Sequence, residues 1–443
     1  MRNRPNEELR LLLTEAGWTG EQLARTVNRL GAEIGATLRY DRTAVSHWLA
    51  GIRPRPPVPG LIAEAFARRL ARPVTAADAG VGPSAPAPRQ EPGPSGLAAE
   101  LGNLSRAQTG AGSGSRVLPE FRYSLAALAV PAWAWELPGW PERTRASAAP
   151  AGTAEAEAAE SIGRVFLAGD AAFGGGSTRR ALAAYLSQDL APRLTAPARP
   201  AIRRRLHLAA AQLTYLCGFM SFDDELNGLA QRYYLTALRL CTDANDQINY
   251  AVTLRAMSVQ ALALGHRRHA VHLAEAAAAS GRAAGPARQA FLYGQLAVAH
   301  AADGDPHNAV AALAAAERRI DQATSTLLVG ACHPASLAHQ RAAVQALLGD
   351  CKGAAGALVQ SIRHRPATER RSRAITLARL AELQLRQGHL DEATATWHTF
   401  LDDHFHLTSG RADTALVTMR AMLRPHTGRP AVRTLLARTA RPV

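Results

Sequence analysis

Lysine is nearly absent from this 443-residue chain: among its 51 lysine and arginine residues, Lys352 is the only lysine. Cysteine is also scarce. The four cysteines form neither a C-x-x-C pair nor a short extracellular framework, so we expect them to be buried and reduced. Aromatic residues make up only 5% of the chain, and no convincing series of alternating strands occurs. Nearly every periodic stretch has helical spacing, which predicts an all-α protein.

Long hydrophobic runs are missing as well. The longest, SLAALAVPAWAWELPGW at 124–140, contains two prolines and one glutamate, so it is too broken to span a membrane. The first residues, MRNRPNEELR, are polar from the start, unlike a secretory signal. We therefore expect a cytoplasmic protein with no membrane partner.

Acidic residues are fewer than basic residues. The chain has 36 aspartates and glutamates, which gives a formal net charge of +15. A general replacement of lysine by arginine explains part of the arginine content but not the excess over acids. Nucleic acid is the commonest partner of a basic protein. The excess is concentrated between Arg39 and Arg72, where seven arginines stand against two acids.

Composition divides the chain into four parts. Residues 1–80 have the pattern of a compact helical unit. Residues 81–116 are rich in proline, glycine, alanine and serine, which predicts a flexible linker. Residues 117–152 hold three tryptophans among prolines, and we expect an extended strap that packs on a neighbouring part. Residues 153–443 are helical throughout and contain a repeat.

The repeat is centred on glycines that each have an alanine five residues later and a small residue seven residues earlier. Small residues let two helices approach closely, and the glycine closes the turn between them, so each copy predicts a helical hairpin that stacks on the next. An upstream copy keeps the register with Glu225 in the glycine position. This spacing resembles tetratricopeptide repeats and implies an α-solenoid. The four glycine copies are Ser258/Gly265/Ala270, Ala297/Gly304/Ala309, Ala342/Gly349/Ala354 and Ala381/Gly388/Ala393.

Within residues 1–80, two short helices are expected in succession. Thr19 is a candidate N-cap for the first, and Asp41 is a candidate N-cap for the second. In the second, YDRTAVSHWLAG, an apolar stripe of Ala44, Val45, Trp48 and Leu49 leaves hydroxyl and cationic side chains on the other face. Such donors reach phosphates and base edges. The candidate DNA-binding residues, with the flanking arginines, are Arg39, Arg42, Thr43, Ser46, His47, Arg53 and Arg55.

The combination "EQLA … TAVSHWLAGIRPRP … LIAEAFARRL" resembles the repressor-like helix-turn-helix domain of XRE-type regulators over roughly residues 7–80. The connection from Asn28 to Asp41 departs from the tight turn of that family. Together with the repeat, the resemblance extends to actinobacterial, quorum-sensing-type cytosolic regulators, and segments such as FDDELNGLAQRYYLTALRL are similar to theirs. It implies a regulator of development or secondary metabolism that binds double-stranded DNA as a homodimer, with two half-sites read by two copies.

A tetratricopeptide solenoid lines its concave face with the first helix of each hairpin. The resemblance therefore implies a groove for a peptide, small-molecule or protein effector. Arg255 could hold a ligand carboxylate through two parallel hydrogen bonds, and Tyr215 offers stacking and a hydroxyl. Ordinary packing or solvated positions are an alternative for every one of these residues. The groove candidates are Tyr215, Phe219, Arg255, Phe291, His339 and Glu382.

Patterns for catalysis, metals or cofactors are weak. The stretch GDAAFGGGST at 169–178 lacks the lysine of a phosphate loop, and His266, His269 and His272 lack a nearby carboxylate partner. We expect no enzyme activity, no cofactor and no metal. The competing class is a protein-interaction scaffold in which the N-terminal unit is a docking module. Salt dependence separates the two, because DNA binding through arginines weakens steeply as salt rises.

Overall fold

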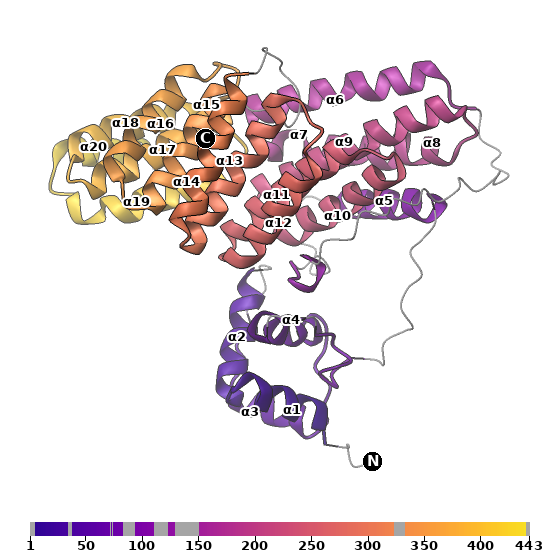
Figure 1. Ribbon diagram of the computed structural model, residues 1–443. Coiled ribbons are helices and arrows are strands. Elements are labelled where there is room, and N and C mark those ends of the chain that lie inside the picture. Colours follow the sequence, from indigo (N-terminus) through magenta and orange to yellow (C-terminus); the bar gives the residue numbers. More distant parts are fainter. Residues whose placement is uncertain are drawn as a thin grey trace. The chain divides into compact units, whose positions relative to one another are not determined.

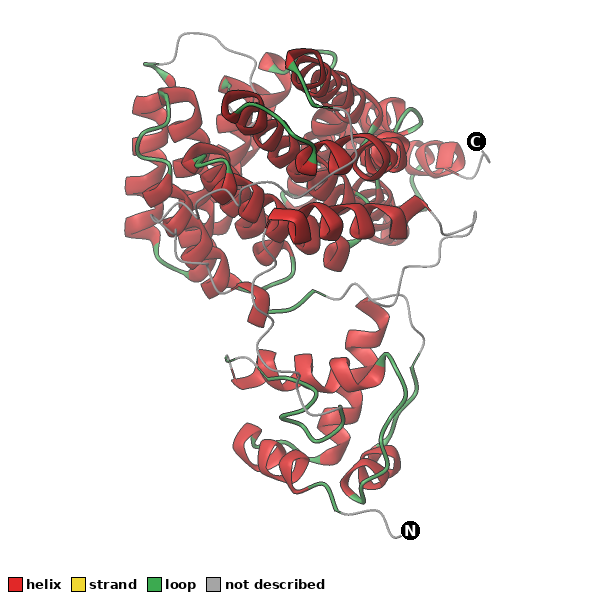
Figure 2. Ribbon diagram, turned by 90° about the vertical axis from the view of Figure 1, so that its right-hand side faces the viewer, coloured by secondary structure: helices red, strands yellow, loops and turns green. Residues whose placement is uncertain are grey.

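The computed structural model describes residues 5–33, 38–70, 72, 74–82, 94–109, 123–128, 150–322 and 333–439 (Figures 1 and 2). All regular structure in these ranges is helical, and they contain no strand, as the sequence predicts. They fall into two compact units, which we treat separately. The first holds residues 5–82 with 123–128, and the second holds 94–109 with nearly all of 150–439.

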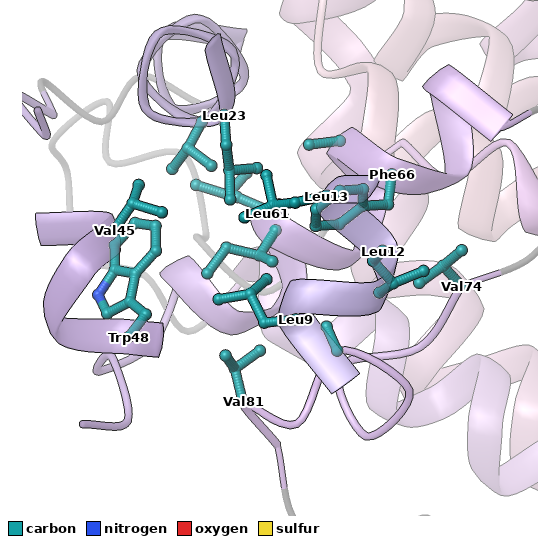
Figure 3. Close-up of a cluster of buried hydrophobic side chains, with 14 of the residues drawn as sticks. Leu9, Leu12, Leu13, Leu23, Val45, Trp48, Leu61, Phe66, Val74 and Val81 are labelled. Atoms are coloured by element: carbon teal, nitrogen blue, oxygen red, sulfur yellow. The ribbon is translucent and has the colours of Figure 1, made fainter. Parts of the chain in front are cut away.

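The N-terminal unit packs four helices around one core: α1 (Glu7–Ala16), α2 (Gly20–Glu33), α3 (Arg42–Leu49) and α4 (Val58–Leu70). Apolar side chains from all four meet there, among them Leu9, Leu23, Trp48 and Phe66 (Figure 3). Burial of this set supplies most of the stabilisation available to so small a unit.

Polar caps fix where these helices begin. Asn6 caps α1 by accepting from the amide of Leu9, and its side-chain amide also donates to the carbonyl oxygen of Ala79 over 3.0 Å. Thr19 and Gln22 form a reciprocal capping box at the start of α2. The first expected N-cap is therefore correct, and the chain beyond α4 is fastened to α1.

The second unit is built from consecutive helices that pack in adjacent pairs, a design compatible with an α-solenoid. Each pair also packs on the next pair along the chain. Figure 1 shows the pairs following one another from red through orange to yellow. The pairs are α9 (Pro200–Asp223) with α10 (Asn227–Asp243), α11 (Gln247–Ala263) with α12 (Arg267–Ser280), α13 (Pro286–Asp303) with α14 (Pro306–Ile320), α15 (Pro334–Leu347) with α16 (Cys351–His364), and α17 (Arg370–Arg386) with α18 (Leu390–His404).

The turns within these pairs use left-handed backbone where the repeat places glycine. Gly265, Gly304, Gly349 and Gly388 have φ between 84° and 91°, and the small residues before and after them are buried. In the upstream copy Glu225 occupies the equivalent position with φ 60°. A residue other than glycine is destabilised at positive φ. The hairpin therefore keeps the same turn geometry at Glu225 despite this conformational cost.

Further helices complete the second unit at both ends. They are α6 (Thr153–Phe173), α7 (Gly175–Tyr185), the π-helical turn Leu186–Leu190, α8 (Ala191–Thr195), α19 (Gly410–Leu423) and α20 (Pro430–Thr439). The last two cover α18, where Trp397 and Phe400 are fully buried against Met419 and Val432.

The expected linker at 81–116 contains a helix, α5 (Pro94–Thr109), which corrects our reading of that segment. Its apolar residues Leu97, Leu101 and Leu104 recur at helical spacing and are buried. The Gln108 side-chain amide donates to the hydroxyl of Tyr233 over 2.5 Å. The proline- and glycine-rich composition around α5 obscured this periodicity.

The expected strap at 117–152 is described only in part. Leu125 and Leu128 are buried in the N-terminal unit, and the amide of Leu125 donates to the Glu64 carboxylate over 3.2 Å. The short 3-10 turn Ala126–Leu128 lies in this stretch. The three tryptophans of the segment lie outside the described residues.

The two ends of the second unit contact each other. The amide of Thr408 donates to the carbonyl of Phe173 over 2.8 Å, and the amide of Gly176 donates to the carbonyl of Thr408 over 3.0 Å. Arg371 of α17 forms an ion pair with Asp170 of α6 at 2.8 Å. These contacts join helices about 200 residues apart in sequence, so the succession of pairs returns to its first helices.

Candidate functional site

The surface around α3 is the first candidate site. Its buried side consists of Val45 and Trp48, which are 0% and 4% exposed, with Ala44 and Leu49 partly buried beside them. The predicted apolar stripe is therefore correct. All seven residues predicted to contact DNA are exposed, on α3 or directly beside it: Arg39, Arg42, Thr43, Ser46, His47, Arg53 and Arg55.

Specific contacts hold α3 in place. Asp41 caps it by accepting from the amide of Ala44 over 2.9 Å, as expected. The Asn28 side chain bridges α2 to the chain before α3, because it accepts from the amide of Tyr40 and donates to the carbonyl of Tyr40, both over 2.8 Å. The Tyr40 ring lies edge-on to Trp48 with centroids 5.3 Å apart. The exposed donors of α3 are thus presented by a fixed helix.

The connection between α2 and α3 is shorter than the sequence suggested. Helix α2 continues to Glu33, past the Asn28 at which we placed its end, with Leu30 buried in the core. Helix α3 ends at Leu49, two residues before Gly51, whose φ is 93°. The exposed Arg53 and Arg55 follow directly.

The exposed arginines at this surface are not committed to acids. Within the described residues, no ion pair involves Arg39, Arg42, Arg53 or Arg55. Other arginines of the same unit are paired: Arg68 lies 3.0 Å from Glu64, whose pKa is raised by burial despite that partner. The arginines beside α3 therefore retain their full hydrogen-bonding capacity toward an external anion.

The second candidate site lies in the second compact unit (the repeat unit). Three of the six predicted groove residues, Phe219, Phe291 and His339, each contact an arginine there. The Arg255 guanidinium lies over the ring of Phe291 at 3.8 Å from its centroid, and Arg371 lies over Phe219 at 4.7 Å. Tyr215 packs against Tyr234 with ring centroids 6.1 Å apart. We call this set, with His339, Arg379 and Arg411, the arginine cluster.

His339 is held as a neutral donor and acceptor. The Thr376 hydroxyl donates to the carbonyl of Ser372, so it accepts from Nδ1 of His339 at 3.1 Å. Nε2 of His339 then accepts from Arg379 at 3.3 Å. Desolvation, with the charges of Arg379, Arg365, Arg411 and Arg255, holds the pKa of His339 well below its usual range.

Glu382, the sixth predicted residue, lies at the edge of the arginine cluster. It is on α17 one turn beyond Arg379 and pairs with Arg386 at 3.7 Å. Burial raises its pKa against the opposing effect of Arg386 and Arg379. It belongs to the same electrostatic environment as Arg379.

A buried ion network forms the base of the cluster. Arg371 pairs with Asp170 at 2.8 Å and lies 3.7 Å from Asp223, and both carboxylates are at most 1% exposed. Burial raises the pKa of Asp170 to about 6, although Arg371 opposes this shift. Asp223 also accepts from the amide of Gly175 at the start of α7 over 3.1 Å. The network therefore links α17 to α6, α7 and α9.

Sequence reasoning missed the arginines of α17 and α19 and both aspartates. Arg371 lies eleven residues before Glu382, a predicted groove residue, so three helical turns place both on nearly the same face of α17. That spacing could have identified Arg371. No sequence pattern could have identified Asp170, because its partner lies 201 residues away.

The described ranges of the chain also bear on metal binding and membrane insertion. They hold no group of three or more histidine, cysteine or acidic residues arranged to bind a metal ion. They also contain no helix that is both long and apolar enough to cross a membrane.

Comparison with known families gives a match over the N-terminal unit. The profile described as "SP15 N-terminal domain" matches residues 9–82, which cover α1 to α4 and the chain that follows them. The match coincides with the described part of the N-terminal unit and does not reach the repeat unit. No curated protein matches the chain.

Proposed function

We propose that this protein is a DNA-binding transcriptional regulator in which α2 and α3 act as a helix-turn-helix, with α3 in the major groove. One observation carries the proposal: α3 is fixed by Asp41, Val45 and Trp48 while its other face presents Arg42, Thr43, Ser46 and His47 to solvent. Short polar and cationic donors on a rigid helix suit phosphates and base edges.

We propose that the repeat unit carries the second part of the function, which is dimerisation or sensing. Its helix pairs, buried small residues and positive-φ turns support a tetratricopeptide-like solenoid. In a regulator of the XRE type with such a domain, the solenoid would mediate homodimerisation, effector or partner sensing, or both. The resemblance implies that such a regulator would act in development or secondary metabolism.

The test is DNA binding by the intact protein and an Arg42→Ala variant. Removal of one phosphate or base contact should weaken operator binding by about 1–3 kcal/mol. Arg282→Ala is the matched control, because Arg282 is an exposed arginine of the repeat unit. Equal operator affinity of Arg42→Ala and the intact protein would show that α3 is not the recognition helix.

Salt dependence tests the same proposal against a scaffold role. Affinity for DNA should fall steeply with salt, by close to one power of concentration for each phosphate contacted. A partner held in an apolar groove would respond little.

A further inference from the structure

We propose that the arginine cluster of the repeat unit is a binding site for a small anionic molecule that carries a carboxylate or phosphate group. The proposal deepens the sensing role of the proposed function by naming the class of ligand. It rests on four contact pairs formed by side chains from α9, α11, α13, α15, α17 and α19. The charges of Arg379, Arg411 and Arg255 all act on His339, which places these three guanidinium groups around one histidine.

The cations of the cluster exceed what its carboxylates neutralise. Arg371 is satisfied by Asp170 and Asp223. Arg379 donates to the neutral His339. The guanidinium of Arg411 stacks over Phe222, 5.1 Å from the ring centroid. Within the described residues, no hydrogen bond or ion pair involves the Arg411 guanidinium. Its donors are therefore available to an anion.

The surroundings of Arg379 and Arg411 strengthen their attraction for an anion. Arg379 is exposed and Arg411 and His339 are half-buried, so water reaches them. Desolvation nevertheless lowers the pKa of Arg379, and it lowers the pKa of Arg411 to about 10. Charge interactions of desolvated groups are stronger than those of fully solvated groups, because the effective dielectric constant around them is lower.

Aromatic side chains contact the arginine cluster and orient part of it. The Arg255 guanidinium stacks on Phe291, 3.8 Å from the ring centroid, and this contact fixes the plane of the guanidinium group. Within the described part of the chain, the buried hydroxyl of Tyr234, beside Tyr215, has no hydrogen-bond partner.

The experiment is calorimetric titration of the full chain with pyrophosphate and, separately, with citrate. Sodium chloride at equal ionic strength controls for general screening. We expect saturable binding of at least one anion, weakened about tenfold or more by Arg411→Met and by Arg379→Met. Arg282→Met, at an exposed position outside the cluster, should bind as the unmodified protein does.

Two results would overturn the proposal: no saturable heat with either anion beyond the chloride control, or equal binding by the unmodified protein and both cluster variants. Circular dichroism of each variant verifies folding. The accessible Arg379→Met retains the test if Arg411→Met fails to fold. Because the titration contains no DNA, a failure to bind anions would not count against the DNA-binding proposal. A failure to bind DNA would likewise leave the anion titration as a valid test of the arginine cluster.

Discussion

Replacement of Asp170 by asparagine should change how the stability of the repeat unit responds to pH. Asp170 is 1% exposed, pairs with Arg371 and has a pKa of about 6, above its ordinary value of 3.8, because burial disfavours its charged form. The folded chain therefore binds this proton more tightly than the unfolded chain does. Protonation of Asp170 consequently adds stability as the pH falls from above 6 toward 4.

The magnitude follows from these two values. Near pH 7.5 the carboxyl is ionised in both states and proton linkage adds almost nothing. Near pH 5 it is largely protonated only in the folded state, which adds about 1.4 kcal/mol to the free energy of unfolding. Asparagine cannot take up the proton, so Asp170→Asn loses this gain. Titrating groups that do not interact with Asp170 contribute equally to both proteins and cancel in the difference.

Urea unfolding of both proteins at about pH 5 and pH 7.5, followed by circular dichroism, measures this difference. Asp402→Asn is the control, because that carboxylate also pairs with an arginine, Arg438, but has a side chain that is 65% exposed. It should show the pH response of the unmodified protein. If Asp170→Asn also shows that response, Asp170 is not a buried carboxylate with a raised pKa and the reasoning is wrong.

Two further substitutions test the packing. Trp48→Ala should destabilise the N-terminal unit by about 3–5 kcal/mol in chemical denaturation, whereas Leu11→Ala, at a side chain that is 69% exposed, should change little; equal effects would contradict the burial of Trp48. Gly175→Ala places a Cβ 2.5 Å from the carbonyl oxygen of Met220 and should lower the melting temperature of the repeat unit, whereas Gly356→Ala has open space in the exposed part of α16 and should raise it slightly; a neutral Gly175→Ala would contradict the close approach of α7 and α9.

Local patterns in the sequence predicted much of the fold. The spacing of Gly265 and its equivalents located the turns, because only a short left-handed connection closes two helices at that distance, and Glu225 was correctly placed in the same register. Asp41 and the stripe of Val45 and Trp48 defined α3. These features depend on residues within one or two helical turns of each other, which is the range over which periodicity is informative.

Long-range features were beyond that range. The contact of Phe173 with Thr408 and the ion pair of Asp170 with Arg371 join opposite ends of the repeat unit. Helical periodicity identifies a buried face but not the distant helix that covers it. Composition was misleading for α5, because the flanking prolines and glycines outweighed the apolar spacing of its leucines. The candidate α3 surface was thus predictable in full, and the arginine cluster only in part.

Genome-wide recovery of DNA by the intact protein, repeated with the Arg42→Ala/Ser46→Ala double variant, tests the central claim most directly. The account predicts discrete sites that share a twofold motif and are lost in the variant, because two copies of α3 read two half-sites. Recovery of no specific DNA by either protein would contradict it and would favour a scaffold whose repeat unit holds a protein partner.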